Sequence, residues 1–142
     1  MAGQGTLAEA EEHFRNAVRI LPTYARAWAR LGIAVDRQGR IEEAAGHYAH
    51  SLELSPDQPR VHNNLAVALA KLGQLDEAIR HLQEATRLEP DFAEAQFNLS
   101  GALEKAHRLD EAVAAARQCV RLDPHNNQYQ LLLARLVRSQ QR

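Results

Sequence analysis

Residues 25–58 read ARAWARLGIAVDRQGRIEEAAGHYAHSLELSPDQ, and the pattern of this stretch returns 34 residues further along the chain. Its only proline, Pro56, belongs to a series at Pro22, Pro56, Pro90 and Pro124 that keeps the same interval of 34 residues. Other positions of the unit, which form the columns of the repeat, recur at the same interval of 34 residues as the prolines. The seventh place of the unit is always leucine, and the eighth and twentieth places hold small residues. Several columns in phase indicate an internal repeat, and repeats of this length are typical of solenoid proteins.

Each unit is predicted to form two amphipathic helices joined by a turn at its fifteenth place. Apolar residues recur at three- and four-residue steps on either side of that place. Gly39 and Gly73 occupy it, where glycine can adopt the left-handed backbone that ends a helix, and His107 occupies it in the following unit. Proline closes the second helix because it cannot continue one. The small residues of the first unit, Gly32 and Ala44, are expected to face each other across the helix pair.

Extended in both directions, the pattern predicts an all-α chain of about eight helices. They are expected over residues 7–21, 25–38, 41–54, 59–72, 75–88, 93–106, 109–122 and 127–140. This divides a single domain over residues 1–142 into a half repeat (5–24), three whole repeats (25–58, 59–92, 93–126) and a terminal helix (127–140). One unit cannot bury its apolar stripe alone, so neighbouring units must stack.

Three parts of the first unit resemble the signature of the tetratricopeptide repeat (TPR) family. They are Trp28-x-x-Leu31-Gly32, Ala44-x-x-x-Tyr48 and Pro56. Val35 stands where the family usually has tyrosine, and the resemblance runs over about residues 5–140. It implies antiparallel helix pairs stacked into a right-handed α-solenoid, whose concave groove is lined by the first helix of each pair. It also implies a scaffold or adaptor that binds a protein or peptide in this groove.

Composition narrows the classes of partner. Charged residues make up 25% of the chain and the net charge is −1, so no overall field attracts nucleic acid or an anionic membrane. The apolar runs are too short to span a bilayer. The lone cysteine, Cys119, falls in a column of small residues and is expected to be buried. A lone cysteine and a start without a signal peptide predict a cytoplasmic protein.

The resemblance implies that six places of each first helix face the groove. We expect the peptide-binding site to include Arg26, Arg30, Ile33, Arg37, Arg60, Asn63, Asn64, Val67, Lys71, Phe97, Asn98, Lys105, Leu131 and Arg135. Across all groove places, basic residues outnumber acidic ones eight to three, which predicts a preference for acidic segments. Solvated helix faces without a binding role are the alternative.

Asn64 and Asn98 share the sixth place of their helices, where their amides could hold the backbone of an extended peptide. The arrangement resembles the asparagine ladder in the TPR superhelix of O-linked N-acetylglucosamine transferase. The ladder is short, since Arg30 and Leu132 hold this place in the outer repeats. The family's clamp for acidic chaperone tails is matched only at Asn64, and Glu94 would repel a carboxylate, so such tails are not expected to bind.

No phosphate-binding loop, nucleophile elbow or metalloprotease motif occurs in the sequence, so we expect no enzyme activity, cofactor or metal site. His13, His47 and His81 share one column and are expected to form a surface row too widely spaced to ligate zinc.

Two other functions stay open at this point. The last helix is apolar around much of its circumference, which predicts an exposed stripe and a homo-oligomer formed through the end helices. Its apolar residues are Leu131, Leu132, Leu133, Leu136 and Val137. The chain could also be the substrate-recruiting segment of a larger enzyme, such as a glycosyltransferase.

Overall fold

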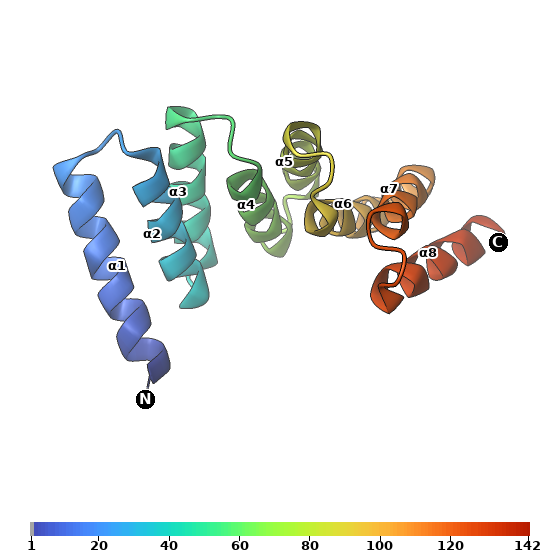
Figure 1. Ribbon diagram of the computed structural model, residues 1–142, viewed down its shortest axis with the longest axis horizontal. Helices are drawn as coiled ribbons and strands as arrows, with labels where there is room; N and C mark the ends of the chain where they lie inside the picture. The colour runs from blue at the N-terminus through green and yellow to red at the C-terminus, as the bar shows by residue number, and fades with distance from the viewer. Residues whose placement is uncertain (1) are drawn as a thin grey trace.

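The computed structural model describes residues 2–142, and within them it contains eight helices and no strand. Figure 1 shows the helices in order along one row, with the chain ends at opposite extremes. They are α1 (Ala2–Ile20), α2 (Ala25–Arg37), α3 (Ile41–Leu54), α4 (Pro59–Lys71), α5 (Leu75–Leu88), α6 (Ala93–Lys105), α7 (Leu109–Leu122) and α8 (Asn127–Gln140). From α2 onward, every helix begins at the predicted residue and ends within one residue of the predicted end. None of the helices in this range is both long and apolar enough to cross a membrane.

The first helix differs from its prediction. It begins at Ala2 instead of residue 7, and Gly5 lies inside it instead of at a turn. Glycine permits a left-handed turn without forcing one, and in a helix it costs only about 1 kcal/mol relative to alanine. The residues that follow, Leu7 to Ala10, are mostly good helix formers, so the helix continues through this site.

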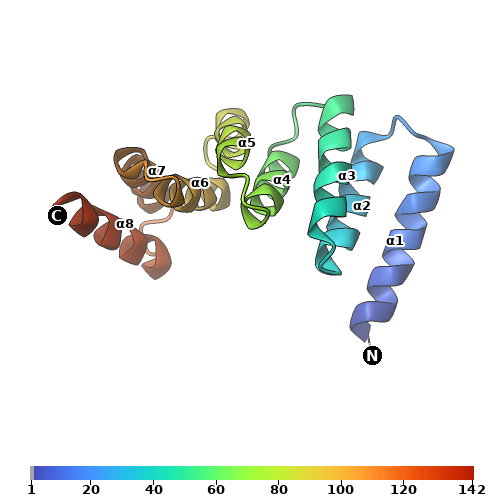
Figure 2. The ribbon, with the colours of Figure 1, turned by 180° about the vertical axis from the view of Figure 1, so that it is seen from behind.

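Helices pack most closely within the pairs α2/α3, α4/α5 and α6/α7, and each pair stacks on the next through α3/α4 and α5/α6. The helices α1 and α8 pack on the two ends of this array, against α2 and α7. Each pair is turned relative to the one before. In Figure 1, α1 to α3 stand nearly upright and α8 lies closer to horizontal, and Figure 2 shows the same progression from behind. The molecule is an α-solenoid.

The repeated columns form the core. The seventh-place residues Leu31, Leu65 and Leu99 are buried, as are the small residues of the twentieth place and Cys119. Burial of Cys119 was predicted and is confirmed, and burial raises the pKa of its thiol to about 11. A Cβ atom added at Gly32 would first meet the ring of Tyr48, one turn after Ala44 on α3, so Tyr48 sets the closest limit at this glycine.

The turns within the three pairs share one geometry. The backbone φ is 84° at Gly39, 82° at Gly73 and 61° at His107, so all three residues are left-handed, as predicted. Each turn closes with two backbone hydrogen bonds of the Schellman type. In the first, Arg40 N donates to Val35 O at 3.2 Å and Gly39 N donates to Asp36 O at 2.8 Å. A repeated local motif therefore sets the same pairing geometry three times.

Candidate functional site

The face formed by the first helices is hollowed near its C-terminal end. A cavity of about 340 Å³ opens between α4, α6 and α8, and a neighbouring hollow shares Phe97, Leu132 and Arg135 with it. We call this continuous surface the C-terminal groove. Of the predicted site residues, it contains Val67, Lys71, Phe97, Asn98, Lys105, Leu131 and Arg135. These come from two repeats and the terminal helix, because each of the three helices contributes the residues of its exposed face.

Phe97 forms the centre of this groove. It is half-buried, and its ring packs on Tyr129 of α8 with centroids 5.5 Å apart. Tyr129 was not predicted as a site residue, because it falls at a place of the repeat that does not face the groove. Its contact with Phe97 joins α6 to α8 beside the groove.

An amide pair joins two of the helices that form the groove. Asn98 Nδ2 donates to Asn63 Oδ1 at 2.9 Å, and Asn63 is only 3% exposed. Asn63 was predicted to face a peptide, yet the structure places it in the interface between α4 and α6. A buried amide requires a partner, and Asn98 supplies it. Asn98 therefore has a structural contact in addition to its position at the groove.

The charge of the groove comes from four cations, Lys71, Lys105, Arg135 and Arg138, and one carboxylate, Glu104. The guanidinium of Arg135 forms two hydrogen bonds to the carboxylate of Glu104, one of them 3.0 Å long, between Nη2 and Oε1. This contact lowers the pKa of Glu104. Lys71 and Lys105 are exposed, and neither makes an ion pair with any residue in the described part of the chain. The groove thus retains an excess of positive charge.

Two family models described as "Tetratricopeptide repeat" match the chain. One matches residues 1–67 and 37–86, and the other matches residues 63–127. The chain belongs to the tetratricopeptide repeat family. No curated protein matches it. Among solved structures it is similar to MamA 41-end from Desulfovibrio magneticus RS-1, with a TM-score of 0.88, 23% identity and coverage of 96% of this chain and 78% of that one.

Two further structures show the same fold. "YrrB: a TPR protein with an unusual peptide-binding site" has a TM-score of 0.86, 21% identity and coverage of 96% of this chain and 71% of that one. "First TPR of Spaghetti (RPAP3) bound to HSP90 peptide SRMEEVD" has a TM-score of 0.79, 21% identity and coverage of 83% and 94%. At this level of identity the likeness concerns the TPR fold alone.

The other predicted site residues lie elsewhere on the first helices of the TPR array: Arg26, Arg30, Ile33, Arg37, Arg60 and Asn64. The first two border a separate hollow between α1 and α2, and Arg37 borders another near Leu7. The guanidinium of Arg60 lies 5.2 Å from the centroid of the Phe92 ring. Ile33 packs partly against the core, and Asn64 is half-buried on α4. The structure therefore brings together only the C-terminal half of the predicted site.

Two histidines that occupy different places of the TPR repeat, His62 and His81, are in contact in the structure. Nδ1 of His62 lies 3.0 Å from Nδ1 of His81, and Nε2 of His62 lies 2.8 Å from the Pro56 carbonyl oxygen. His81 was predicted to lie in a surface row, but it is half-buried, and burial lowers its pKa. Within residues 2–142, no group of three histidine, cysteine or acidic side chains is arranged to hold a metal ion.

Proposed function

We propose that this protein is a non-catalytic interaction module that holds an acidic, extended segment of a partner protein in the C-terminal groove. TPR proteins of the same fold include one with a described peptide-binding site and one bound to a peptide of HSP90, which supports a general role in protein interaction. The observation that carries the proposal is the combination of a half-buried aromatic ring, Phe97, with the unpaired cations Lys71 and Lys105 in one hollow.

The lining of the groove restricts the chemistry of the segment. An apolar side chain of the partner would cover Phe97 and Val67, which belong to the apolar part of the lining. Carboxylates on either side of it would pair with Lys71 and Lys105, which mainly accelerates association and selects against basic segments. The C-terminal tail of a chaperone fits poorly, because only Asn64 matches the family's clamp for such tails. An internal acidic segment fits better.

The test uses peptides selected from a random display library against the wild-type chain and then measured by calorimetry. Acidic peptides should bind Lys71→Glu/Lys105→Glu about tenfold more weakly, with most of the loss in the association rate at low salt. Phe97→Ala should cost about 1–2 kcal/mol of binding. The matched control is Gln74→Arg on the opposite face, which should leave acidic peptides unaffected. Selection of no acidic class, or equal binding to all variants, contradicts the proposal.

Asn64 and Asn98 have to be tested separately, although the sequence predicts the same peptide-holding role for both. Asn98→Ala would leave the Asn63 amide buried without its partner, at a cost of about 1–3 kcal/mol of folding free energy. Asn64 makes no side-chain hydrogen bond to another residue in the described range. Asn64 lies on α4 outside the lining of the C-terminal groove, so it contacts only a segment that extends beyond the groove along the first helices. For such a segment, Asn64→Ala should weaken binding by about 0.5–1.5 kcal/mol without loss of stability.

Self-assembly through the ends is a second candidate, favoured by the exposed apolar side chains at both ends of the array. Leu131 of α8 is 70% exposed and Ile20 at the end of α1 is 75% exposed. Leu21 and Tyr24, in the connection to α2, are exposed as well. Contacts between such ends would join copies of the chain in a row, and the mass in solution separates this function from binding of a foreign segment.

A further inference from the structure

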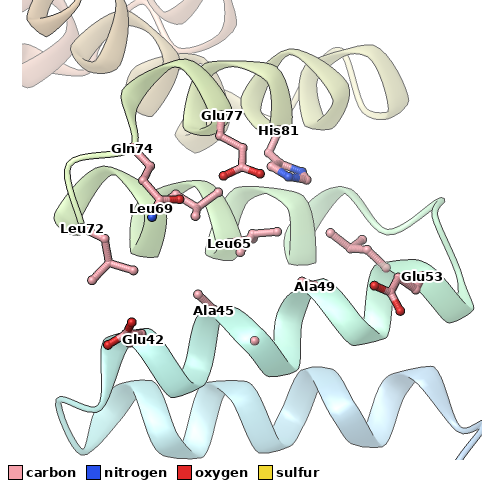
Figure 3. Close-up of a pocket in the computed structure, with 12 residues that line it drawn as sticks. Glu42, Ala45, Ala49, Glu53, Leu65, Leu69, Leu72, Gln74, Glu77 and His81 are labelled. Carbon is pink, nitrogen blue, oxygen red and sulfur yellow. The ribbon is translucent and has the colours of Figure 1, made fainter.

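A second groove lies on the other side of α4, between α3 and α5. Its volume is about 510 Å³. Figure 3 shows Ala45 and Ala49 of α3 along one wall, Leu65 and Leu69 of α4 at the floor, and Glu77 and His81 of α5 along the opposite wall. We call it the outer groove. Residues 65 and 69 point away from residues 67 and 71 at 100° per residue, so the two grooves occupy roughly opposite faces of α4.

The repeat explains why a groove opens here. Ala45 and Ala49 correspond, one period earlier, to Glu11 and Arg15 of α1. Those longer side chains bridge α1 and α3, since Arg15 Nη2 lies 2.6 Å from Glu43 Oε2. Glu11 accepts a hydrogen bond of 2.8 Å from Arg40. Ion pairs therefore span the equivalent space at the N-terminal end.

One period later, the corresponding residues are Ile79 and Gln83 of α5. Both are larger than alanine, and Ile79 is buried in the core. The small pair on α3 is thus specific to the interval between α3 and α5. Alanine at both places leaves a hollow over Leu65 and Leu69, which are themselves 3% and 7% exposed.

Charge at the rim departs from the repeat in the same interval. Arg40 pairs with Glu43, and one or two periods later the same places hold Gln74 with Glu77 and Arg108 with Glu111. Gln74 supplies no positive charge, so Glu77 lacks the arginine that its two equivalents have.

Two more carboxylates border the outer groove, Glu42 and Glu53, which lie near its two ends in Figure 3. Glu53 has only His50 nearby, at 3.6 Å, and none of the described residues that line the groove is lysine or arginine. His81 is the remaining titratable group in the lining, and burial lowers its pKa, which favours the neutral ring. An apolar floor is therefore bordered by three carboxylates, none of which forms an ion pair with a lysine or arginine of the described residues.

We propose that the outer groove binds a segment of a partner protein in which a large apolar side chain is flanked by lysine or arginine. The apolar side chain would rest over Leu65 and Leu69, between the alanines of α3 and the α5 wall, and the flanking cations would pair with Glu42, Glu53 and Glu77. This goes beyond the function proposed above, because the face is different and the charge preference is opposite. The protein would then hold an acidic segment on one face and a basic segment on the other.

A second copy of the chain is a less suitable occupant. The exposed apolar residues Ile20 and Leu131 belong to the end helices α1 and α8, whereas the outer groove is lined by α3, α4 and α5 within the array. A contact between an end and a side is heterologous and would continue into an open polymer unless it happened to close into a ring. The uncompensated carboxylates instead fit a foreign basic segment.

Gln74→Arg provides the sharpest test. It places arginine where Arg40 and Arg108 already occur, so it should fold normally and give Glu77 a cation. Among peptides selected from a random display library against the wild-type chain, we expect a class with an apolar residue flanked by lysine or arginine. By calorimetry, this class should bind Gln74→Arg about tenfold more weakly, because like charges then meet. Ala49→Arg should abolish binding by filling the groove, with thermal melting to confirm its fold.

The control is Lys71→Glu/Lys105→Glu in the C-terminal groove, which should not weaken binding of the basic class. The control variant changes only the C-terminal groove, and Gln74→Arg changes only the outer groove. The two proposals can therefore fail independently of each other in the same peptide-binding experiment. The inference is wrong if no basic class is selected, or if that class binds Gln74→Arg as well as it binds the wild type. It is also wrong if the wild-type chain self-associates and Gln74→Arg dissociates it, because a second copy then fills the groove.

Discussion

At the scale of single residues, the tightest packing constraint is between Gly32 and Tyr48. A Cβ atom added to Gly32 would lie 2.7 Å from two carbons of the Tyr48 ring. The ring has little room to move, because Tyr48 is 1% exposed and its hydroxyl donates to Asp36 Oδ2 at 3.0 Å. The later repeats place Ala66 with Leu82, and Ser100 with Ala116, at the same two places. A smaller residue in the first column thus accompanies a larger one in the second.

Gly32→Ala is therefore expected to destabilise the fold by about 1–3 kcal/mol through overpacking. The measurement is the free energy of unfolding from urea denaturation. The matched control is the double variant Gly32→Ala/Tyr48→Leu, which reproduces the pair found at residues 66 and 82. Its cost should be clearly smaller than the sum of the two single costs, whereas additive costs would mean that the ring does not constrain Gly32.

His107→Gly is expected to stabilise the fold by about 0.5–1 kcal/mol, because a left-handed backbone strains a residue with a Cβ atom and not glycine. His107 has φ 61° and is exposed, so little contact is lost on its removal. The urea midpoint should rise. Gly73→His, the reverse change at the equivalent turn, should lower it. A lower midpoint for His107→Gly would show that the histidine side chain stabilises this turn.

At the scale of elements, α1 is attached to the array by an ionic network as well as by apolar packing. Glu11 accepts hydrogen bonds from Arg40, Gln38 and Arg15, and these contacts lower the pKa of its carboxyl from 4.5 to about 2, with Arg40 contributing most. A group whose pKa is lower in the folded state stabilises that state fully only above its unfolded pKa. The stabilisation is therefore complete above about pH 4.5 and is lost as the pH falls toward about 2.

Glu11→Gln should accordingly remove part of the acid sensitivity of α1. At neutral pH the variant should exchange the amide hydrogens of α1 faster than the wild type, and this difference should shrink as the pH falls below about 4.5. Hydrogen exchange over α1 resolves the effect, because an end helix can open locally. Glu12→Gln, an exposed neighbour on the same helix, should behave as the wild type. An unchanged difference across this pH range would mean that Glu11 does not stabilise the docking of α1.

At the scale of the whole molecule, the C-terminal end exposes less apolar surface than the sequence predicts. An exposed stripe was expected on α8, but Leu132 and Leu136 are buried, and Leu133 and Val137 pack partly against the core. Only Leu131 of this group is largely exposed. The twist of the array turns most of the apolar side of α8 onto α7, so a single side chain is left instead of a stripe.

We expect the chain to self-associate weakly, with Leu131 in the contact. Leu131→Glu should shift the mass distribution toward the monomer in sedimentation velocity over a wide range of protein concentration, because it places a charge in an apolar contact. Leu72→Glu, at an exposed leucine away from the ends, is the control and should leave the distribution unchanged. If the wild-type chain is monomeric at the highest concentration, the ends do not associate.

The sequence by itself determined the features that repeat. Columns such as Leu31 and Leu65, or Gly39 and Gly73, placed the helices and turns almost residue by residue, because helix periodicity and a left-handed glycine are properties of the local backbone. The first helix is the exception. A glycine permits a turn there without imposing one, and the local sequence favours continuing the helix.

Only the tertiary structure decided how side chains from different repeats combine. It buried Asn63 against Asn98, joined His62 to His81, and opened a groove beside Ala45 where other repeats are bridged or filled. The position of a residue within one helix determines where its side chain points, but it does not determine which residue of another helix that side chain contacts. The exposure of a side chain depends on the sizes and charges of neighbours about one period away, and on the angle at which successive helix pairs stack. Those quantities exist only once the array has formed, and for this reason the binding surfaces were harder to predict than the fold.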